Sequence, residues 1–393
     1  MKRIHALDFF RGIMLILITV DHFLSEKDIV RHFTYEFIGW VTAAEGFVFL
    51  SGLTAGIIYT HKLNKKGERY TNEAAKKRAW LIYRNHIAIL LFALIAVLFG
   101  YGLNEYWVNH YSLFAENPFL SIFLGATLLY QPIYLDILPM YAVFILFVPI
   151  VIKYFEKGIV WQLFACSIGL YMFPIFMGSN ILNDITQIRD INTGFFNLLS
   201  WQFLFFLGLF SGFSYYYGKT NQWLNNKYLL LSSLILFSGL FLIKNLHVNL
   251  NGLDLLFSKN ILGPVRLINC LSIVFIIAFV STKKLHWFSS KPMCYLGRYS
   301  LEVYSFHVLL IILLKPLKEE FSDFYSIQIT HYFFAYPLAL LMILLLIVPA
   351  LFLAPTLLRK KTYVLRKTEA IPPYEDAELA NDSLSLEENK QLV

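Results

Sequence analysis

Long apolar stretches alternate with short polar ones along most of the chain. At about 20 apolar residues per crossing, this pattern predicts ten membrane-spanning helices. They cover residues 7–24, 37–60, 80–102, 135–155, 159–177, 197–217, 228–246, 263–281, 299–317 and 331–356. A further apolar stretch at 118–130 is too short to cross and suits a re-entrant or interfacial helix. The pattern therefore predicts an all-α, polytopic bundle of membrane helices.

Basic residues orient the predicted bundle. With ten crossings and a cytoplasmic N-terminus, the cytoplasmic segments carry 24 of the 33 Lys and Arg residues, and eight fall outside. This bias agrees with the positive-inside rule. Counting 118–130 as a crossing would turn the later basic loops outward and largely remove the bias. We therefore expect both termini to lie in the cytoplasm.

Composition supports a membrane protein. The chain is 58% hydrophobic and 15% charged, whereas a soluble domain is about one quarter charged. The net charge of +7 lies mainly in the predicted cytoplasmic segments, so it does not indicate nucleic-acid binding. Three widely spaced cysteines, Cys166, Cys270 and Cys294, predict neither a disulfide framework nor a metal site. The N-terminus runs into the first span without a small-residue cleavage site, which is typical of a retained anchor.

The composition changes near the C-terminal end. We predict a transmembrane domain over residues 1–357 and a cytoplasmic tail over 358–393 that is basic at first and then acidic. The tail contains Pro and Ser and has too few large apolar residues to form a core. It is therefore predicted to be disordered.

The first predicted span carries four ionisable side chains, Asp8, Arg11, Asp21 and His22. Placing an ionisable side chain in hydrocarbon costs free energy. Arg11 and His22 are about 20° apart around the helix and roughly 16 Å apart along it. His22, near the outer end, is the best candidate for a general base; the alternative is a histidine in the headgroup region. Arg11 would anchor an anionic ligand or form a structural pair with Asp8.

The second predicted span contains Glu45 in an apolar run, at about the depth of His22. A carboxylate beside an imidazole fixes its tautomer, so we expect Glu45 to orient His22. Ser51, which lies between Gly46 and Gly52, is a candidate substrate-binding residue. The alternative is that these small residues serve close helix packing.

Polar residues in later spans extend the candidate site. Asp136, at the outer mouth of the fourth span, would bind polar substrate groups or cap its helix. Trp201 and Gln202 in the sixth span and Asn269 in the eighth would line a cavity. Arg266 would line it too or extend to the outer interface. In the ninth span, His307 lies near mid-membrane with Glu302 and Ser305 within two turns, and it needs a partner or an aqueous cavity there.

These residues predict a polar chamber within a helical bundle, with a base near the outer face and positive charge on the inner face. This arrangement suits transfer of a group from an anionic cytoplasmic donor to a hydroxyl outside. It also suits a proton-coupled transporter or flippase of a sugar or lipid-linked glycan. We see no inverted repeat of the kind transporters often show, but the residues alone leave both functions open.

Five stretches in order resemble the OpgC family within the wider transmembrane acyltransferase superfamily. They are Leu7-Asp-Phe-Phe-Arg-Gly12 with His22, Ala44-Glu-Gly-Phe-Val-Phe-Leu-Ser-Gly52, Leu135-Asp-Ile-Leu-Pro-Met-Tyr141, Trp201-Gln202, and Ser300-Leu-Glu-Val-Tyr-Ser-Phe-His307. The resemblance runs from about residue 3 to 357. The spacing of Arg11 and His22 is shared across the superfamily, and the run ending at Gly52 is more particular to this family.

The resemblance implies a multi-pass protein of the bacterial inner membrane that succinylates periplasmic glucans. Its donor would be an acyl-CoA, succinyl-CoA or acetyl-CoA, and its acceptor a hydroxyl of an extracytoplasmic carbohydrate. Carried over to this chain, His22 is the general base, Glu45 its partner and Arg11 a structural or donor-binding residue. Asp136 and His307 match family motifs. Membrane lipid is a further expected partner, no metal is expected, and the oligomeric state is left open, a dimer included.

Overall fold

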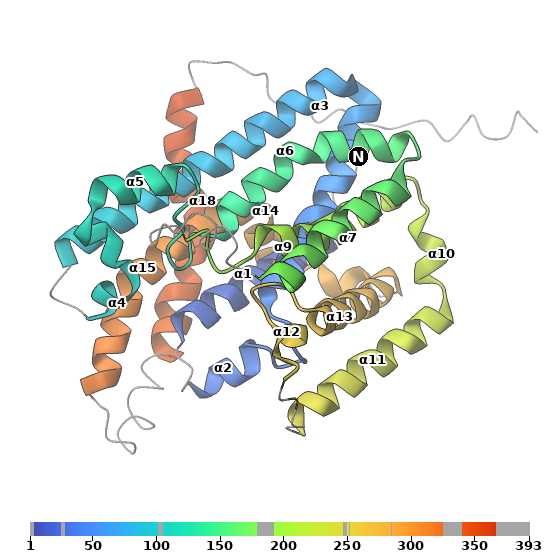
Figure 1. The fold of residues 1–393 in the computed structure, drawn as a ribbon. Coiled ribbons are helices and arrows are strands. Elements are labelled where there is room, and N and C mark those ends of the chain that lie inside the picture. Colours follow the sequence, from blue (N-terminus) through green and yellow to red (C-terminus); the bar gives the residue numbers. More distant parts are fainter. Residues whose placement is uncertain are drawn as a thin grey trace, which may run out of the picture. The chain divides into compact units, whose positions relative to one another are not determined.

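A computed structural model describes residues 4–24, 28–100, 105–178, 192–246, 250, 252–283, 285–324 and 340–366. Every regular element among these residues is a helix (Figure 1). The chain divides into two compact units, Met1–Pro355 and Thr356–Val393. The candidate functional residues all lie in the first unit.

The long helices carry the predicted spans. They are α1 (His5–Phe23), α3 (Ala43–Gly100), α6 (Ile137–Glu156), α7 (Val160–Met177), α9 (Leu198–Tyr216), α11 (Lys227–Asn245), α13 (Pro264–Lys283), α15 (Ser300–Phe324) and α18 (Val348–Arg366), the last preceded by the π-helical turn Ile343–Ile347. Short helices connect them: α2 (Ile29–Thr34), α4 (Glu105–Glu116), α5 (Pro118–Ala126), α10 (Thr220–Leu224), α12 (Asp254–Phe257), the 3-10 turn η1 (Leu285–Phe288) and α14 (Lys291–Arg298).

Eight helices of the described residues are long and apolar enough to cross a membrane. The prediction of ten spans differs from this number for two reasons. Helix α1 carries too many charged residues to count as an apolar membrane helix. Helix α3 contains both the second and the third predicted span. The protein is therefore an all-α, polytopic membrane protein, as predicted.

Helix α3 shows where the predicted boundaries were wrong. It begins at Ala43 rather than at residue 37, and the expected loop over 61–79 is helical. The chain bends at Gly67, whose φ of 77° is left-handed and suits glycine best. Figure 1 shows the two limbs of α3 meeting at this bend.

The predicted short helix at 118–130 corresponds to α5. The side chain of Asn117 accepts a hydrogen bond from the backbone N–H of Leu120, and Pro118 occupies the first turn, as is common at helix starts. At the C-terminal end, residues 358–366 are helical rather than disordered. Residues 331–339 of the last predicted span and 367–393 of the predicted tail lie outside the described residues.

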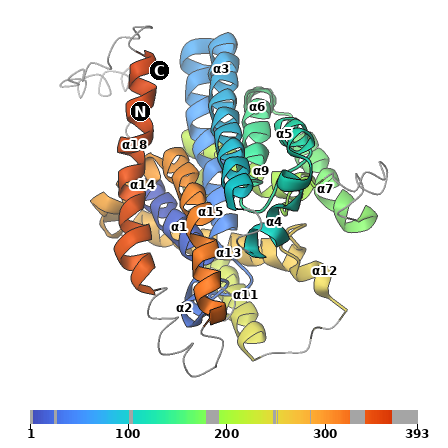
Figure 2. The same cartoon turned by 90° about the vertical axis from the view of Figure 1, so that its left-hand side faces the viewer.

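Close helix contacts hold the bundle around the site. Glycines of α3 and α9 face each other's backbone, so that a Cβ added at Gly52 would collide with the carbonyl of Phe205, and one at Gly208 with the carbonyl of Phe49. This is the small-residue packing that lets membrane helices approach closely. Helix α1 packs against α14 and α15 (Figure 2). The side chains of α1 therefore face both α3 and α15.

Candidate active site

Two histidines from distant parts of the chain meet in the bundle. His307 Nε2 of α15 lies 3.3 Å from His22 Nδ1 of α1, and the two rings are stacked with centroids 5.5 Å apart. His307 is fully buried, whereas His22 is half-buried. His22 is therefore the more exposed member of the pair.

The surroundings of the pair assign its protons. His307 Nδ1 lies 2.5 Å from the backbone carbonyl of Tyr304, and a carbonyl oxygen only accepts hydrogen bonds. His307 Nδ1 therefore carries a proton, and in the neutral ring Nε2 is an acceptor. The proton between the rings then belongs to His22 Nδ1, which leaves the lone pair of His22 on Nε2.

A pocket lies beside the N-terminal half of α1. Its polar lining comes from Arg11, Ser51, Arg78, Tyr141 and Ser300. Arg11 Nη2 is 3.4 Å from the Ser51 hydroxyl, and Arg11 Nε has no hydrogen-bond partner among the described residues. Two guanidinium groups around one pocket favour a ligand with several negative charges, because each is a planar donor that matches phosphate or carboxylate.

Tyr304 joins the pocket to the histidine pair. Its side chain lines the pocket, its ring centroid lies 4.6 Å from that of His307, and its carbonyl is the acceptor for His307 Nδ1. At the C-terminal end of α1, Lys315 donates to the carbonyls of Phe23 and Leu24, at 3.1 and 2.9 Å. This buried lysine fixes the end of the helix that carries His22.

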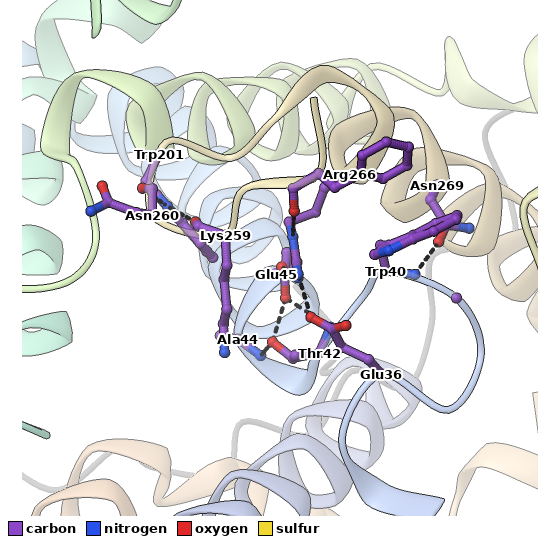
Figure 3. Close-up of polar contacts among 12 residues, drawn as sticks. Glu36, Trp40, Thr42, Ala44, Glu45, Trp201, Lys259, Asn260, Arg266 and Asn269 are labelled. Atoms are coloured by element: carbon purple, nitrogen blue, oxygen red, sulfur yellow. Dashed lines mark hydrogen bonds and ion pairs between the residues drawn. The ribbon is translucent and has the colours of Figure 1, made fainter. Parts of the chain in front are cut away.

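An ionic cluster surrounds the start of α3 (Figure 3). Arg266 Nη1 lies 2.6 Å from Glu45 Oε1, and Arg266 Nη2 also pairs with Glu36. Lys244 Nζ lies 2.9 Å from the second oxygen of Glu36. Burial alone would raise the pKa of the Glu36 carboxyl, but Arg266 and Lys244 outweigh it and hold that pKa below its ordinary value.

Glu45 has different partners from those expected. Besides Arg266, its carboxylate accepts hydrogen bonds from the backbone N–H and the hydroxyl of Thr42, at 2.9 and 2.5 Å. Thr42 and Glu45 form a capping box at the start of α3. The expectation that Glu45 lies against His22 is therefore wrong, and His307 occupies that place.

Several other predicted ligands are engaged in helix contacts. Trp201 Nε1 donates to the carbonyls of Lys259 and Asn260, at 3.1 and 2.9 Å. Gln202 bonds to both the hydroxyl and the carbonyl of Ser167 in α7. These two residues join elements of the bundle instead of lining the cavity we expected.

Asp136 and Asn269 hold loops. Asp136 precedes α6, but its side chain does not cap that helix and instead accepts from the backbone N–H of Phe195 at 3.0 Å. Asn269 accepts from the backbone N–H of Trp40 at 2.9 Å. Arg266, predicted either to line the cavity or to extend to the outer interface, is buried in the ionic cluster.

The remaining predicted residues lie on α1 and α15. Asp8 is buried where α1 packs against α14, and its backbone carbonyl faces Gly297. Ser305 is buried without a partner for its hydroxyl among the described residues. Glu302 is half-buried, as is Asp21, the neighbour of His22.

Sequence reasoning missed Arg78, Tyr304, Glu36, Lys244 and Lys259. Arg78 lies in a basic run that resembles any cytoplasmic loop of a membrane protein. Lys244 and Lys259 could have been recognised as unusual, because both belong to the few basic residues that the predicted orientation places outside. Among the described residues, no group of three or more His, Cys, Asp or Glu side chains could hold a metal ion.

The family comparison covers most of the chain. The family model described as OpgC protein matches residues 3–355, nearly the whole chain. The chain belongs to the OpgC family. No curated protein and no solved structure matches it.

Membership in the OpgC family implies a membrane acyltransferase for periplasmic glucans. The half-buried His22 and the two-arginine pocket are the features of this OpgC protein that suit such chemistry.

Proposed function

We propose that the protein moves an acyl group, succinyl or acetyl, from a cytoplasmic acyl-CoA to a hydroxyl of a periplasmic glucan, with His22 as the general base. The observation that carries this proposal is the directed hydrogen-bond chain from His22 through His307 to the Tyr304 carbonyl. The chain leaves a lone pair on the Nε2 atom of the half-buried ring. A base must present such a lone pair to its substrate.

The reaction balances with this one base. His22 Nε2 takes the proton of the acceptor hydroxyl while the oxygen attacks the thioester carbonyl. The carbon–sulfur bond then breaks, and the leaving thiolate receives the proton from His22. The products are an ester on the glucan and CoA with a free thiol, and His22 returns to its starting form.

His307 acts as a positioning residue. As His22 gains a proton it becomes an imidazolium, and the hydrogen bond from its Nδ1 to His307 Nε2 becomes charge-assisted and therefore stronger. The buried ring of His307 cannot turn away without losing its bond to the Tyr304 carbonyl. The pair thus serves the role that a carboxylate and histidine share in a triad.

The pocket around Arg11 and Arg78 supports a donor site on the inner side. The phosphates of CoA carry the negative charge that two guanidinium groups favour. Arg11 lies roughly 16 Å along α1 from His22. A thioester arm extending along α1 from this pocket would bring the acyl carbon to the base.

The decisive assay measures labelled acyl transfer from succinyl-CoA or acetyl-CoA to a linear glucan oligosaccharide by the purified protein. We expect transfer by wild type, and a loss of about 10²- to 10⁴-fold in His22→Gln. The matched control is His32→Gln, because His32 is exposed on α2. Absence of CoA release with both donors would refute the proposal.

Donor binding has its own test. CoA should raise the melting temperature of the wild-type protein, and this shift should shrink in Arg11→Gln. Bound ligand stabilises the folded state in proportion to its affinity. An equal shift in Arg11→Gln and wild type would refute the assignment of the pocket to the donor.

A further inference from the structure

The segment that precedes α13 presents one lysine toward the site. Lys259 has no carboxylate within ion-pair distance among the described residues, whereas Arg266 and Lys244 are both paired there. Its ammonium lies 4.9 Å from the ring centroid of Tyr35 and 5.9 Å from that of Phe196. In Figure 3 its side chain extends toward Ala44 without a polar contact to the residues drawn.

The backbone that carries Lys259 is fixed. The indole N–H of the fully buried Trp201 donates to the carbonyls of Lys259 and Asn260. The carbonyl of Asn260 also accepts from the backbone N–H of Asn197 at 3.0 Å. Two donors at the start of α9 therefore hold the backbone that carries Lys259, unlike that of a surface lysine on a loose loop.

Asp21 is the counterpart of this lysine. Its Oδ1 atom is shielded from solvent yet has no hydrogen-bond partner among the described residues. Asp21 interacts with Thr34, and the next residue, Tyr35, carries the ring below Lys259. Asp21 and Lys259 act on each other electrostatically, but they form no ion pair. Asp21 therefore offers a hydrogen-bond acceptor, and Lys259 offers a cationic donor without a carboxylate partner among the described residues.

We propose that Asp21 and Lys259, with the rings of Tyr35 and Phe196, bind the hydroxyl-bearing acceptor and hold it beside His22. This inference rests on the proposed acyl transfer and adds the place where the acceptor binds. A sugar hydroxyl both donates and accepts, so it satisfies a carboxylate and an ammonium at once. Aromatic rings beside such polar groups suit the apolar faces of a sugar ring.

Charged groups of both signs surround the site. Glu36 and Glu45 are neutralised by Arg266 and Lys244, and Asp21 interacts electrostatically with both Lys259 and Arg31, whose guanidinium carbon lies 4.5 Å from the ring centroid of Tyr35. A carboxylate placed here would be attracted by Lys259 and repelled by Asp21. Burial raises the pKa of Tyr35 to about 12, so its hydroxyl stays protonated and adds another donor.

The position beside the base follows from the chain itself. Asp21 directly precedes His22, and Tyr134 packs on the His22 ring with centroids 4.7 Å apart. Lys259 is close enough to act electrostatically on His22 as well as on Asp21. A hydroxyl held by this pair would therefore lie at the end of α1 that carries His22, within electrostatic range of its ring.

The test compares Asp21→Asn and Lys259→Gln with wild type in steady-state transfer to a linear glucan oligosaccharide. We expect the KM for the oligosaccharide to rise about tenfold in each variant, as for the loss of a hydrogen bond to a charged group. The KM for acyl-CoA should not change. Lys259→Arg, which keeps the charge and hydrogen-bond donors, should raise the KM for the oligosaccharide less than Lys259→Gln does.

The matched control for charge removal is Asp254→Asn, on the exposed face of α12, and it should behave as wild type. A second measurement uses the wild-type protein only. The oligosaccharide should slow labelling of Lys259 by an amine-directed reagent but not labelling of the exposed Lys227. This readout does not depend on whether the variants fold.

Any one of three results would overturn the acceptor site. The first is an unchanged KM for the oligosaccharide in both variants, and the second is no protection of Lys259 from labelling. A rise in the KM for acyl-CoA instead would place the pair on the donor side and equally overturn it. Failure of the proposed function looks different, since the wild-type protein would then release no CoA from any donor.

Discussion

The two histidines should be unequal in catalysis although they touch each other. The proposed mechanism makes His22 the base and His307 the acceptor of the hydrogen bond from His22 Nδ1, so removing each ring should lower the rate by a different factor. A general base contributes about 10²- to 10⁴-fold to the rate. A hydrogen bond that orients the base is worth about 0.5–1.5 kcal/mol, which corresponds to roughly two- to thirteenfold.

The experiment measures kcat for acyl transfer in His22→Ala, His307→Ala and His307→Gln at saturating donor and acceptor. We expect a loss of about 10²-fold or more for His22→Ala and about tenfold for His307→Ala. In His307→Gln the amide oxygen still accepts the proton from His22 Nδ1. That variant should therefore lose less than His307→Ala.

Because His307 is fully buried, its replacement by Ala also leaves a cavity that lowers stability. Melting temperatures of all three variants must accompany the rates, and His307→Gln controls for this effect because it fills more of the space. The reasoning is refuted if His307→Ala loses as much activity as His22→Ala while remaining folded. That result would make His307 the base and reverse the direction of the hydrogen-bond chain.

Three further predictions concern the charged residues. Arg78→Gln should raise the KM for acyl-CoA about tenfold, whereas the exposed Arg84→Gln on the same helix should not; equal effects would argue against the pocket as donor site. Arg266→Met should lower the free energy of unfolding by about 3–5 kcal/mol, because it leaves the buried Glu45 carboxylate without its cation; adding Glu45→Gln should recover part of this loss, measured by thermal unfolding in detergent. Glu36 stabilises the fold in a pH-dependent way, since its folded-state pKa lies below the ordinary value of 4.5. The melting-temperature difference between wild type and Glu36→Gln should be constant from about pH 6 to about pH 8 and shrink as the pH falls below about 4.5; a difference that stays constant in acid would contradict the ion pairs.

Local patterns predicted most of the fold. Ten apolar segments of membrane length correspond to helices because helix length in a bilayer follows directly from the number of consecutive apolar residues. The same reasoning found the short helix after Asn117. It failed over 61–79, where a basic stretch continues as a helix, because charge alone does not distinguish a solvated helix from a loop.

At Glu45 the local sequence pattern predicted the structure better than the expected catalytic role did. Thr42-Ala-Ala-Glu45 is a capping-box sequence directly before an apolar run, and the structure uses it as one. Its second partner, Arg266, lies 221 residues away. No local pattern predicts that partner, since it depends on how α13 packs.

The sequence by itself determined that this is a polytopic membrane protein of the OpgC family and that its first helix carries an arginine and a histidine on one face. Both follow from local periodicity and from motifs in order along the chain. Only the tertiary structure decided that His22 meets His307, which is 285 residues away, and that Arg11 shares a pocket with Arg78. The physical reason is that helix packing, not spacing along one helix, selects the neighbours of a side chain.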